Sequence, residues 1–353
     1  MAFVDIFKPE RPIMKVCMMG PKAVGKTTVL TAVFNEMQKQ IAGTELNLIA
    51  LGDTNAELIT RQHQLTAMFK KQEDIVDNKE QANNPQGGIA ATAYETRFDF
   101  SLGFIGKDPI MDLEILDFPG ENVVKYPDNV KSYIKESQAV FLAVDTPHLM
   151  ERDGDFNGVK NKPDIITQLF SEAINSIDSE KLIVFIPLKC EKYLNEKRMP
   201  EIIARIEQEY QSLIDLFKCN TNICCTIAPI LTLGGVEFED FSYHADGKVR
   251  LAPDDCPENV LYRYAGEKKY APLFCSQPLY ALLSFVAAQY KRESNPNDKN
   301  WLEKIKSWIW RRISNDYASF FNEILKLEKT RIASNMQFGY KVLCGINLFH
   351  YNF

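Results

Sequence analysis

The sequence predicts a three-layer α/β/α domain built on a mostly parallel β-sheet. Short apolar runs alternate along the chain with amphipathic segments of helical length, a pattern typical of buried strands joined by helical crossovers. Glycine and proline, at 17 each in 353 residues, are too few for a low-complexity architecture. The runs expected to form strands are 13–19, 94–102, 111–118, 139–145, 182–187 and 223–228. The segments expected to form helices are 26–40, 54–76, 129–136, 163–177, 200–217 and 277–290.

Local signals set where several of these elements begin and end. A Gly20-Pro21 pair closes the first strand, and the next helix starts after the following loop, at Lys26. Thr54 with Glu57 three residues later forms a capping-box pattern, which predicts the start of a long helix. The second and third apolar runs lie close together in the chain and are expected to form adjacent strands.

The chain is expected to divide into a main domain, residues 1–290, and a C-terminal helical extension, residues 301–353. Within the main domain we expect a helical insertion at about 44–77 and a β insertion at about 236–270. In the second insertion Asp246-Gly247 lies between short β-prone runs, which predicts a hairpin turn. In the extension, hydrophobic residues recur at helical spacing from Trp301 to Leu327.

The composition argues against several classes of function. Lys and Arg number 41 against 47 Asp and Glu, a net charge of −6, so broad electrostatic binding of nucleic acid is not expected. A transmembrane helix needs about 20 consecutive apolar residues, and no segment of the sequence is that long. The start of the chain lacks the features of a secretory signal. We therefore expect a cytoplasmic protein. The eight cysteines include no C-x-x-C pair and the four histidines lie far apart, which argues against a disulfide framework or a zinc site.

The segment from Gly20 to Thr27 fits the phosphate-binding pattern G-x-x-x-x-G-K-[ST] at every required position. It lies between an expected strand and an expected helix, the context that this chemistry needs. Backbone N–H groups of such a loop surround a β-phosphate, Lys26 reaches the β- and γ-phosphates, and Thr27 binds Mg²⁺. The predicted nucleotide-binding residues are Gly20, Lys22, Ala23, Val24, Gly25, Lys26, Thr27 and Thr28.

A second motif, Asp117-Phe118-Pro119-Gly120, closes the strand expected at 111–118 and fits the pattern D-x-x-G. In this pattern Asp117 holds Mg²⁺ through water, and the backbone N–H of Gly120 binds the γ-phosphate. Glycine suits that position because the backbone must approach the ligand closely.

With these two motifs, Gly20–Thr27 and Asp117–Gly120, the sequence resembles the translation-factor and small-GTPase class of P-loop GTPases. The resemblance covers about residues 13–290. It implies a P-loop GTPase fold that binds GTP or GDP with Mg²⁺ and acts as a molecular switch. Within this class, the sequence is most similar to bacterial double-GTPase-type proteins. The similarity lies in the long connection between the first two core strands, the Asp-Phe-Pro-Gly version of the second motif and the stretch Thr232–Val236.

The resemblance also implies a guanine-reading motif, [NT]-K-x-D, after the fifth core strand, and the sequence offers two candidates. Asn161–Asp164 matches every position, but a polar segment rather than a buried strand precedes it. Leu188–Glu191 departs twice from the pattern, yet directly follows the apolar run 182–187. We therefore favour Lys189 and Glu191 as base-binding residues and interpret the other candidate as a helix start.

The same resemblance implies the remaining roles. Thr92 is expected to bind Mg²⁺ beside Thr27 and Asp117, whereas the neighbouring Thr96 falls within the expected strand. Glu121 stands where many small GTPases have a glutamine that orients water. A glutamate could orient or deprotonate water, but its charge would also repel the γ-phosphate. Unassisted hydrolysis is therefore expected to be slow. The predicted catalytic residues are Lys26, Gly120 and Glu121.

The leading hypothesis is a Mg²⁺-dependent GTP-binding protein, with slow or partner-stimulated GTP hydrolysis, that reports its nucleotide state to a protein partner. The partner surface is expected at the switch loops, around Thr92 and 117–126, or on the C-terminal helices. Packing of those helices on the main domain is the alternative for their hydrophobic stripe. Two other functions stay open: an ATP-using P-loop enzyme, such as an ATPase or kinase, and a nucleotide-bound scaffold with little turnover.

Overall fold

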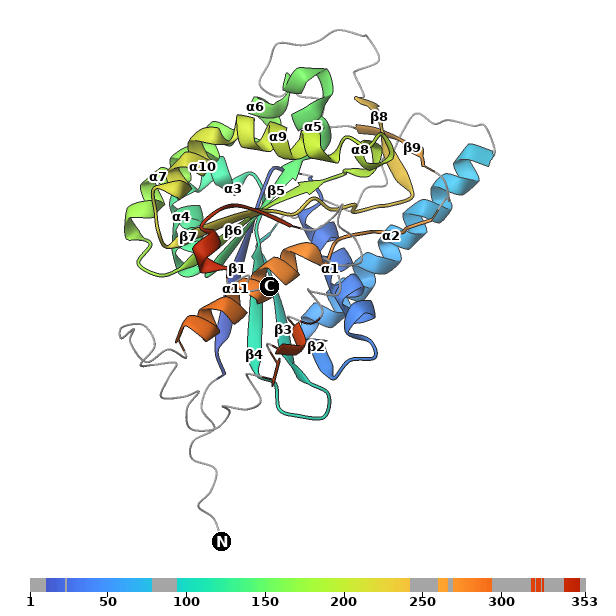
Figure 1. Ribbon diagram of the computed structural model, residues 1–353. Helices are drawn as coiled ribbons and strands as arrows, with labels where there is room; N and C mark the ends of the chain where they lie inside the picture. The colour runs from blue at the N-terminus through green and yellow to red at the C-terminus, as the bar shows by residue number, and fades with distance from the viewer. Residues whose placement is uncertain are drawn as a thin grey trace.

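A computed structural model of the protein describes residues 11–22, 24–77, 94–241, 260–265, 269–293, 319–320, 322–324, 326 and 340–349. Within these residues the chain forms a large, mostly parallel β-sheet with helices on both of its faces (Figure 1). The architecture is therefore mixed α/β, as the alternation of apolar runs and amphipathic segments predicts.

Eight strands of the described residues form the large sheet: β1 (Ile13–Met19), β2 (Leu46–Ala50), β3 (Thr96–Phe104), β4 (Met111–Asp117), β5 (Ala139–Asp145), β6 (Lys181–Leu188), β7 (Ile223–Ile227) and β10 (Lys341–Cys344). Their order across the sheet is β10-β7-β6-β5-β1-β4-β3-β2. The strands from β7 to β4 in this order are parallel, whereas β3, β2 and β10 pair antiparallel with their neighbours.

The longer helices of the described residues are α1 (Lys26–Ile41), α2 (Asp53–Asp77), α4 (Pro127–Glu136), α7 (Pro163–Ala173), α9 (Met199–Glu209), α10 (Gln211–Lys218) and α11 (Gln277–Glu293). Shorter ones are α3 (Asn122–Lys125), α5 (Thr146–Met150), α6 (Asn157–Lys160) and α8 (Glu191–Asn195), with 3-10 turns at Glu151–Gly154, Ile174–Ser176 and Ile346–Leu348. The single helix expected at 200–217 is divided at Tyr210, whose φ of −109° leaves the helical region. Its buried ring packs against Phe185, with centroids 5.1 Å apart.

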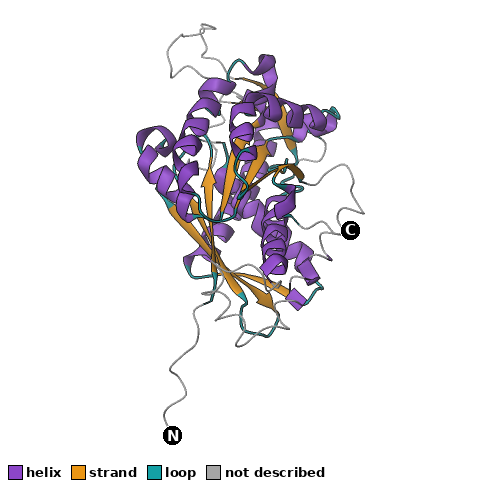
Figure 2. Ribbon diagram, turned by 60° about the vertical axis from the view of Figure 1, so that its left-hand side comes forward, coloured by secondary structure: helices purple, strands orange, loops and turns teal. Residues whose placement is uncertain are grey.

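Helices lie on both sides of the central strands (Figure 2). Alternate side chains of these strands belong to two hydrophobic cores, one on each face of the sheet. In β1, Val16 and Met18 enter the core that contains residues of α1, α2 and α11. Cys17 and Met19 enter the other core, with residues of α4, α7, α9 and α10. Strands buried on both faces form continuous apolar runs, which is why β5 and β6 are recognisable in the sequence.

The insertion expected to be helical at 44–77 begins with a strand instead. Leu46–Ala50 form β2, which pairs antiparallel with β3 and extends the sheet, and the helix α2 follows it. A five-residue strand has too short a pattern to be distinguished from a helical segment by sequence. The helix start expected at Asp53 and Thr54 is confirmed, because α2 begins at Asp53. The Thr54 hydroxyl accepts a hydrogen bond of 2.9 Å from the N–H of Asp99 and so joins α2 to β3.

The described parts of the C-terminal extension pack on the main domain. Phe320 and Ile324 are buried in the core that contains α11. The ring of Phe320 meets that of Phe104 edge to face, with centroids 5.9 Å apart. Lys341–Cys344 form a strand, not a helix as expected, because their backbone pairs with β7. The hydrophobic positions expected from Trp301 to Tyr317 lie outside the described residues.

The β insertion contains a second, two-stranded antiparallel sheet. It consists of β8 (Val236–Phe241) and β9 (Val260–Tyr264). The turn expected at Asp246-Gly247 lies outside the described residues.

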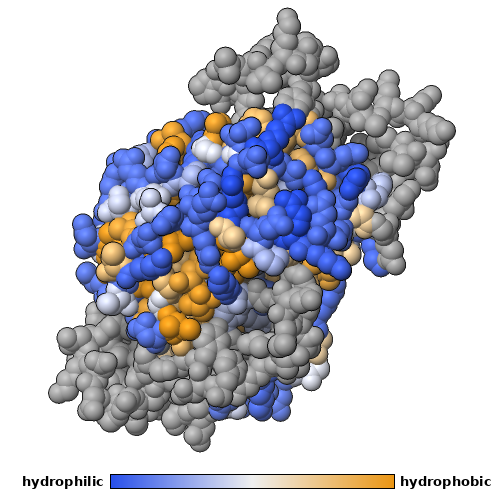
Figure 3. Space-filling view, turned by 45° about the horizontal axis from the view of Figure 1, so that its top comes forward, coloured by the Kyte–Doolittle hydropathy of each residue, from blue (hydrophilic) through white to orange (hydrophobic). Residues whose placement is uncertain are grey.

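Figure 3 shows one face of the molecule, on which hydrophilic residues cover most of the coloured surface and hydrophobic residues gather on the left side. Where the chain is described, none of its helices has both the length and the apolar character that crossing a bilayer requires. The cysteines of this part are free thiols, and no three of its His, Cys, Asp and Glu side chains cluster to hold a metal ion.

Substitution of Gly345 tests the placement of β10. Its φ is +72°, and an added Cβ would lie 2.3 Å from the carbonyl oxygen of Ile223 in β7. We expect Gly345→Ala to detach β10 and to lower the free energy of unfolding by more than the roughly 1–2 kcal/mol of left-handed strain alone. Gly106→Ala is the matched control, because Gly106 has a φ of +74° and no atom within 4 Å of an added Cβ. Equal losses in the two variants, measured by urea unfolding, would contradict this contact.

Candidate functional site

The two predicted phosphate motifs leave neighbouring strands at the same edge of the sheet. β1 and β4 are parallel, and their register places Met18 beside Asp117. The loop from Gly20 to Gly25 begins where β1 ends and leads into α1, while Asp117 is the last residue of β4. In open α/β sheets, ligands bind outside the carboxyl ends of the strands.

Side chains of both motifs meet at the base of this loop. The Thr27 hydroxyl, in the first turn of α1, donates a hydrogen bond of 2.7 Å to Oδ2 of Asp117. Both side chains are buried. Hydroxyl and carboxylate oxygens suit Mg²⁺, which proteins hold through one or two such groups together with waters and substrate phosphates. The donor pair therefore fits a metal site that a bound nucleotide would complete.

Lys26 lies beside this pair, with its ammonium group turned back over the loop. Its Nζ donates to the carbonyl oxygens of Gly20 and Pro21, both at the long distance of 3.4 Å. Burial lowers the pKa of Lys26, the Asp117 carboxylate opposes this effect, and Lys160 adds to it. An anion in the loop would favour the charged form, since a buried ammonium group needs a counter-charge.

Two glycines allow the loop after β1 to turn into α1 and to lie against the segment after β4. Gly25 precedes α1 with a φ of +104°, in the left-handed region that glycine adopts without strain. Gly120 packs against the loop itself, because an added Cβ would lie 2.4 Å from the backbone N of Lys22 and 2.6 Å from the carbonyl oxygen of Gly20. Any larger residue at position 120 would push the two motifs apart.

The other predicted loop residues have different surroundings. Val24 is buried in the core that contains α1, so it anchors the loop from within. Thr28 is half-buried in the first turn of α1. Ala23 lies outside the described residues.

Thr92, the expected third metal ligand, also lies outside the described residues. Thr96 is the first residue of β3, where it pairs in register with Asp117 of β4. Its hydroxyl donates a hydrogen bond of 3.5 Å to the carbonyl oxygen of Tyr94.

Glu121 follows Gly120 and is held between two lysines. Its Oε1 lies 3.2 Å from Nζ of Lys22 in the loop, and its Oε2 accepts a hydrogen bond from Lys125 one turn later. The hydrogen bonds from Lys125 and Lys22 lower the pKa of Glu121. Its carboxylate is therefore ionised at neutral pH, and its charge is offset by two ammonium groups.

The favoured base-reading segment lies at the end of β6. Glu191 opens α8 and is 2% exposed. Its Oε1 accepts hydrogen bonds from the backbone N–H groups of Leu233, at 2.8 Å, and Gly234, at 3.1 Å. Burial raises the pKa of Glu191, and these amides oppose the rise. The carboxylate thus joins the end of β6 to the loop after β7.

Lys189 pairs with a residue that sequence reasoning missed. Its Nζ lies 2.6 Å from Oδ2 of Asp145, whose Oδ1 lies 2.7 Å from Nδ1 of His148. Asp145 and His148 are fully buried. Burial alone would raise the pKa of Asp145, but Lys189 and then His148 outweigh it and hold that pKa well below its usual range. The sequence contains one indication of Asp145, because this residue ends an otherwise apolar strand at the edge of the sheet where ligands bind in such folds.

The alternative base motif, Asn161–Asp164, is a helix start, as expected. Pro163 begins α7, and Lys162 before it has a φ of +53°. Asn161 is buried and brackets the backbone of Asp145, accepting from its N–H at 2.8 Å and donating to its carbonyl oxygen at 3.1 Å. This amide therefore fixes the end of β5.

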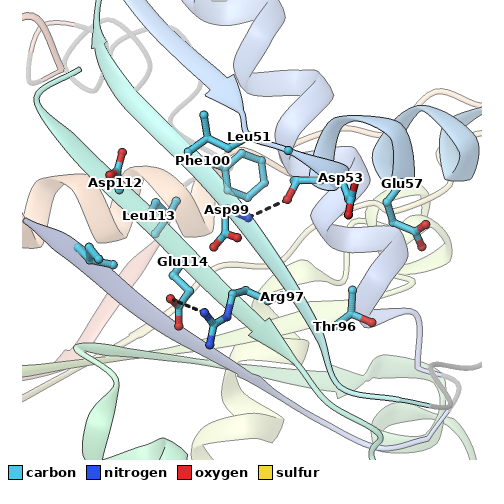
Figure 4. A pocket seen from close by; sticks show the side chains of 13 residues that line it. Leu51, Asp53, Glu57, Thr96, Arg97, Asp99, Phe100, Asp112, Leu113 and Glu114 are labelled. Carbon is cyan, nitrogen blue, oxygen red and sulfur yellow. Dashed lines mark hydrogen bonds and ion pairs between the residues drawn. The ribbon is translucent and has the colours of Figure 1, made fainter. Parts of the chain in front are cut away.

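A separate pocket of about 630 Å³ lies over β3 and β4, beside the start of α2 (Figure 4). Arg97 forms an ion pair of 3.4 Å with Glu114 within it. Five carboxylates line the pocket, those of Asp53, Glu57, Asp99, Asp112 and Glu114. Their negative charge disfavours binding of a phosphate. The lining includes no residue of the two predicted phosphate motifs.

No protein-family model and no curated protein matches the chain. Solved structures similar to it include two of the Ski7 GTPase-like domain from S. cerevisiae. The one bound to GDP and inorganic phosphate is 14% identical, with a TM-score of 0.35 over 68% of this chain and 47% of that chain. The one bound to GTP is 12% identical, with a TM-score of 0.37 over 63% and 43%. The chain thus spans less than half of these structures, and a likeness of this size assigns it no function. Neither is a bacterial double-GTPase-type protein, so the narrower resemblance gains no support.

Removal of the Asp145 charge is expected to destabilise the protein. Asp145→Asn leaves the ammonium group of Lys189, whose side chain is 12% exposed, without its carboxylate. Breaking a buried ion pair in this way costs about 3–5 kcal/mol, which urea unfolding at pH 7 measures. Asp215→Asn is the control, because Asp215 pairs with Lys218 at the surface and its loss should change stability by less than about 0.5 kcal/mol. Similar stabilities for the two variants would refute this role.

Proposed function

We propose that this protein binds GTP together with Mg²⁺, hydrolyses it slowly and acts as a nucleotide-dependent switch. The observation that carries the proposal is the 2.7 Å contact between Thr27 and Asp117, which brings together two motifs that lie 90 residues apart. Binding of one triphosphate and its metal needs this juxtaposition. The packing of Gly120 against the loop supports the same site.

Each residue of the site has a proposed role. The loop amides and the start of α1 bind the β-phosphate, and the Gly120 N–H binds the γ-phosphate. Lys26 exchanges its two long carbonyl contacts for the β- and γ-phosphates. Thr27, Asp117 and Thr92 hold Mg²⁺, which neutralises phosphate charge when bound.

Hydrolysis is proposed to be slow without a partner. Glu121 is the candidate to orient the attacking water, and both of its oxygens are engaged by lysines. The two motifs, Gly20–Thr27 and Asp117–Gly120, contain no arginine. The positive charge that accelerates phosphoryl transfer in this class is therefore proposed to come from a partner protein.

Guanine is the proposed base. An ionised carboxylate at Glu191 accepts hydrogen bonds only, which suits the N1–H and exocyclic amine of guanine, whereas adenine has an acceptor at N1. An ATP-using enzyme is the second candidate. It is favoured by Leu188, which stands where the pattern has Asn or Thr, and by the use of the Glu191 Oε1 within the protein.

A protein partner is proposed to read the switch through residues 117–126 and the segment around Thr92, since such loops become ordered with the γ-phosphate. A nucleotide-bound scaffold with little turnover is the further alternative, favoured by Glu121 in place of glutamine. The double-GTPase-type resemblance and the cytoplasmic location stay predictions from the sequence.

Calorimetric titration with GTP, GDP and ATP, with and without Mg²⁺, tests the proposal. We expect GTP to bind more tightly with Mg²⁺ and Asp117→Ala to abolish that difference. Lys26→Ala should weaken GTP binding roughly 10- to 100-fold, because it removes charge-assisted hydrogen bonds of about 1.5–3 kcal/mol. Lys39→Ala, an exposed lysine of the same helix, is the control and should bind normally. Tighter binding of ATP than of GTP would favour the second candidate instead.

Glu191→Gln tests the choice of base. Xanthine has a carbonyl where guanine has its amine, and the glutamine amide can donate to that carbonyl while its oxygen still accepts from Leu233 and Gly234. We expect the variant to lose roughly tenfold in GTP affinity, as for one bidentate base contact, and to gain affinity for XTP. Competition binding with both nucleotides measures the change. Unaltered GTP affinity would remove Glu191 from the base site.

A further inference from the structure

The ion pair of Lys22 with Glu121 connects the phosphate loop to the segment that follows Asp117. The two side chains meet at 3.2 Å, and the preceding Gly120 packs against the backbone N of Lys22 itself. Lys22 therefore contacts this segment through both its backbone and its side chain. It also occupies a position that the phosphate-binding pattern leaves free to vary.

The ion pair of Lys22 with Glu121 can be broken at little cost in stability, which would let Lys22 pair with another anion. The side chains of Lys22 and Glu121 are 51% and 36% exposed, and exposed ion pairs add little to stability. Lys125 holds the other carboxylate oxygen of Glu121, so the glutamate keeps one cation when Lys22 departs. The backbone N of Lys22 packs closely against Gly120, which places its side chain where the two motifs meet.

We propose that Lys22 passes from Glu121 to the γ-phosphate when a triphosphate binds, so that Glu121 sets how strongly the site prefers triphosphate over diphosphate. This inference rests on the proposed function, since it needs a nucleotide in the loop. A diphosphate has no γ-phosphate and leaves the pair of Lys22 with Glu121 intact. With a triphosphate, Oε1 of Glu121 is released and becomes able to accept a hydrogen bond from water.

Direct repulsion between Glu121 and the γ-phosphate is the competing explanation for any effect of Glu121 on the preference for triphosphate over diphosphate. The two explanations differ in whether Lys22 is needed. If Glu121 acts by competing for Lys22, neutralising Glu121 has no effect on the preference once Lys22 is gone. If repulsion alone operates, the effect persists without Lys22. A double-mutant cycle separates them.

The experiment compares the dissociation constants of GDP and of β,γ-imido-GTP, which is not hydrolysed, in the full chain with Mg²⁺. Glu121→Gln should raise the triphosphate preference roughly threefold, as expected for an exposed ion pair. Lys22→Ala should lower it roughly tenfold, through loss of a charge-assisted contact. The double variant should match Lys22→Ala. Lys131→Ala, which removes a surface lysine paired with Asp128 and Glu172, should change nothing.

Two outcomes would overturn the inference: a preference that Glu121→Gln leaves unchanged, or an effect of Glu121→Gln that survives in the Lys22→Ala background. Both are distinct from failure of the proposed function, in which the unaltered protein binds neither guanine nucleotide. Lys22→Met, which keeps most of the side-chain length, separates loss of charge from loss of packing and should behave as Lys22→Ala does.

Discussion

The parallel pairing of β1 with β4 is the constraint on which the candidate site depends. Its register sets Met18 beside Asp117, so the loop after β1 and the turn after β4 leave the sheet together. The Thr27 hydroxyl then reaches the Asp117 carboxylate at 2.7 Å, and Gly120 lies against the loop backbone. A shift of one residue would turn Asp117 to the opposite face of the sheet, because strand side chains alternate with a period of two. The two cores, which fill both faces of these strands, hold this register in place.

Buried charged side chains at the carboxyl ends of the strands are stabilised by opposite charges or by backbone amides. Asp145 and Lys189 join the ends of β5 and β6, and the backbone of Asp145 is bracketed by the Asn161 amide. Glu191 meets two backbone amides of the next loop. Each group offsets the cost of removing its neighbour from water. Lys26 differs, because its ammonium group donates to two backbone carbonyl oxygens at the long distance of 3.4 Å. A bound phosphate would supply the counter-charge that these carbonyl groups lack.

The central strands are predictable from sequence because their signals are local, and the two predicted phosphate motifs are recognisable for the same reason. Strands buried on both faces form continuous apolar runs, and the motifs have fixed spacing. The edge strands β2 and β10 are not predictable in this way, since they have only five and four residues and depend on partners far along the chain, as in the pairing of Cys344 with Cys225. The pair of Asp145 with Lys189 was missed for the same reason, because 44 residues separate its members. The hydrogen bond from the Asp99 N–H to the Thr54 hydroxyl is a further contact of this kind, because 45 residues separate its members.

A glutamate beside a phosphate site is costly only if its charge is uncompensated. Here the compensation comes from Lys22, at a position of the loop that the motif leaves open, and from Lys125 one turn beyond Glu121. Considered singly, Glu121 follows a predicted motif and Lys22 is a variable residue of the loop. Considered together, they form an ion pair of 3.2 Å, in which the loop lysine already has an anionic partner. Under the proposed function, an incoming γ-phosphate competes with Glu121 for the ammonium group of Lys22, which makes the affinity for triphosphate depend on both residues together.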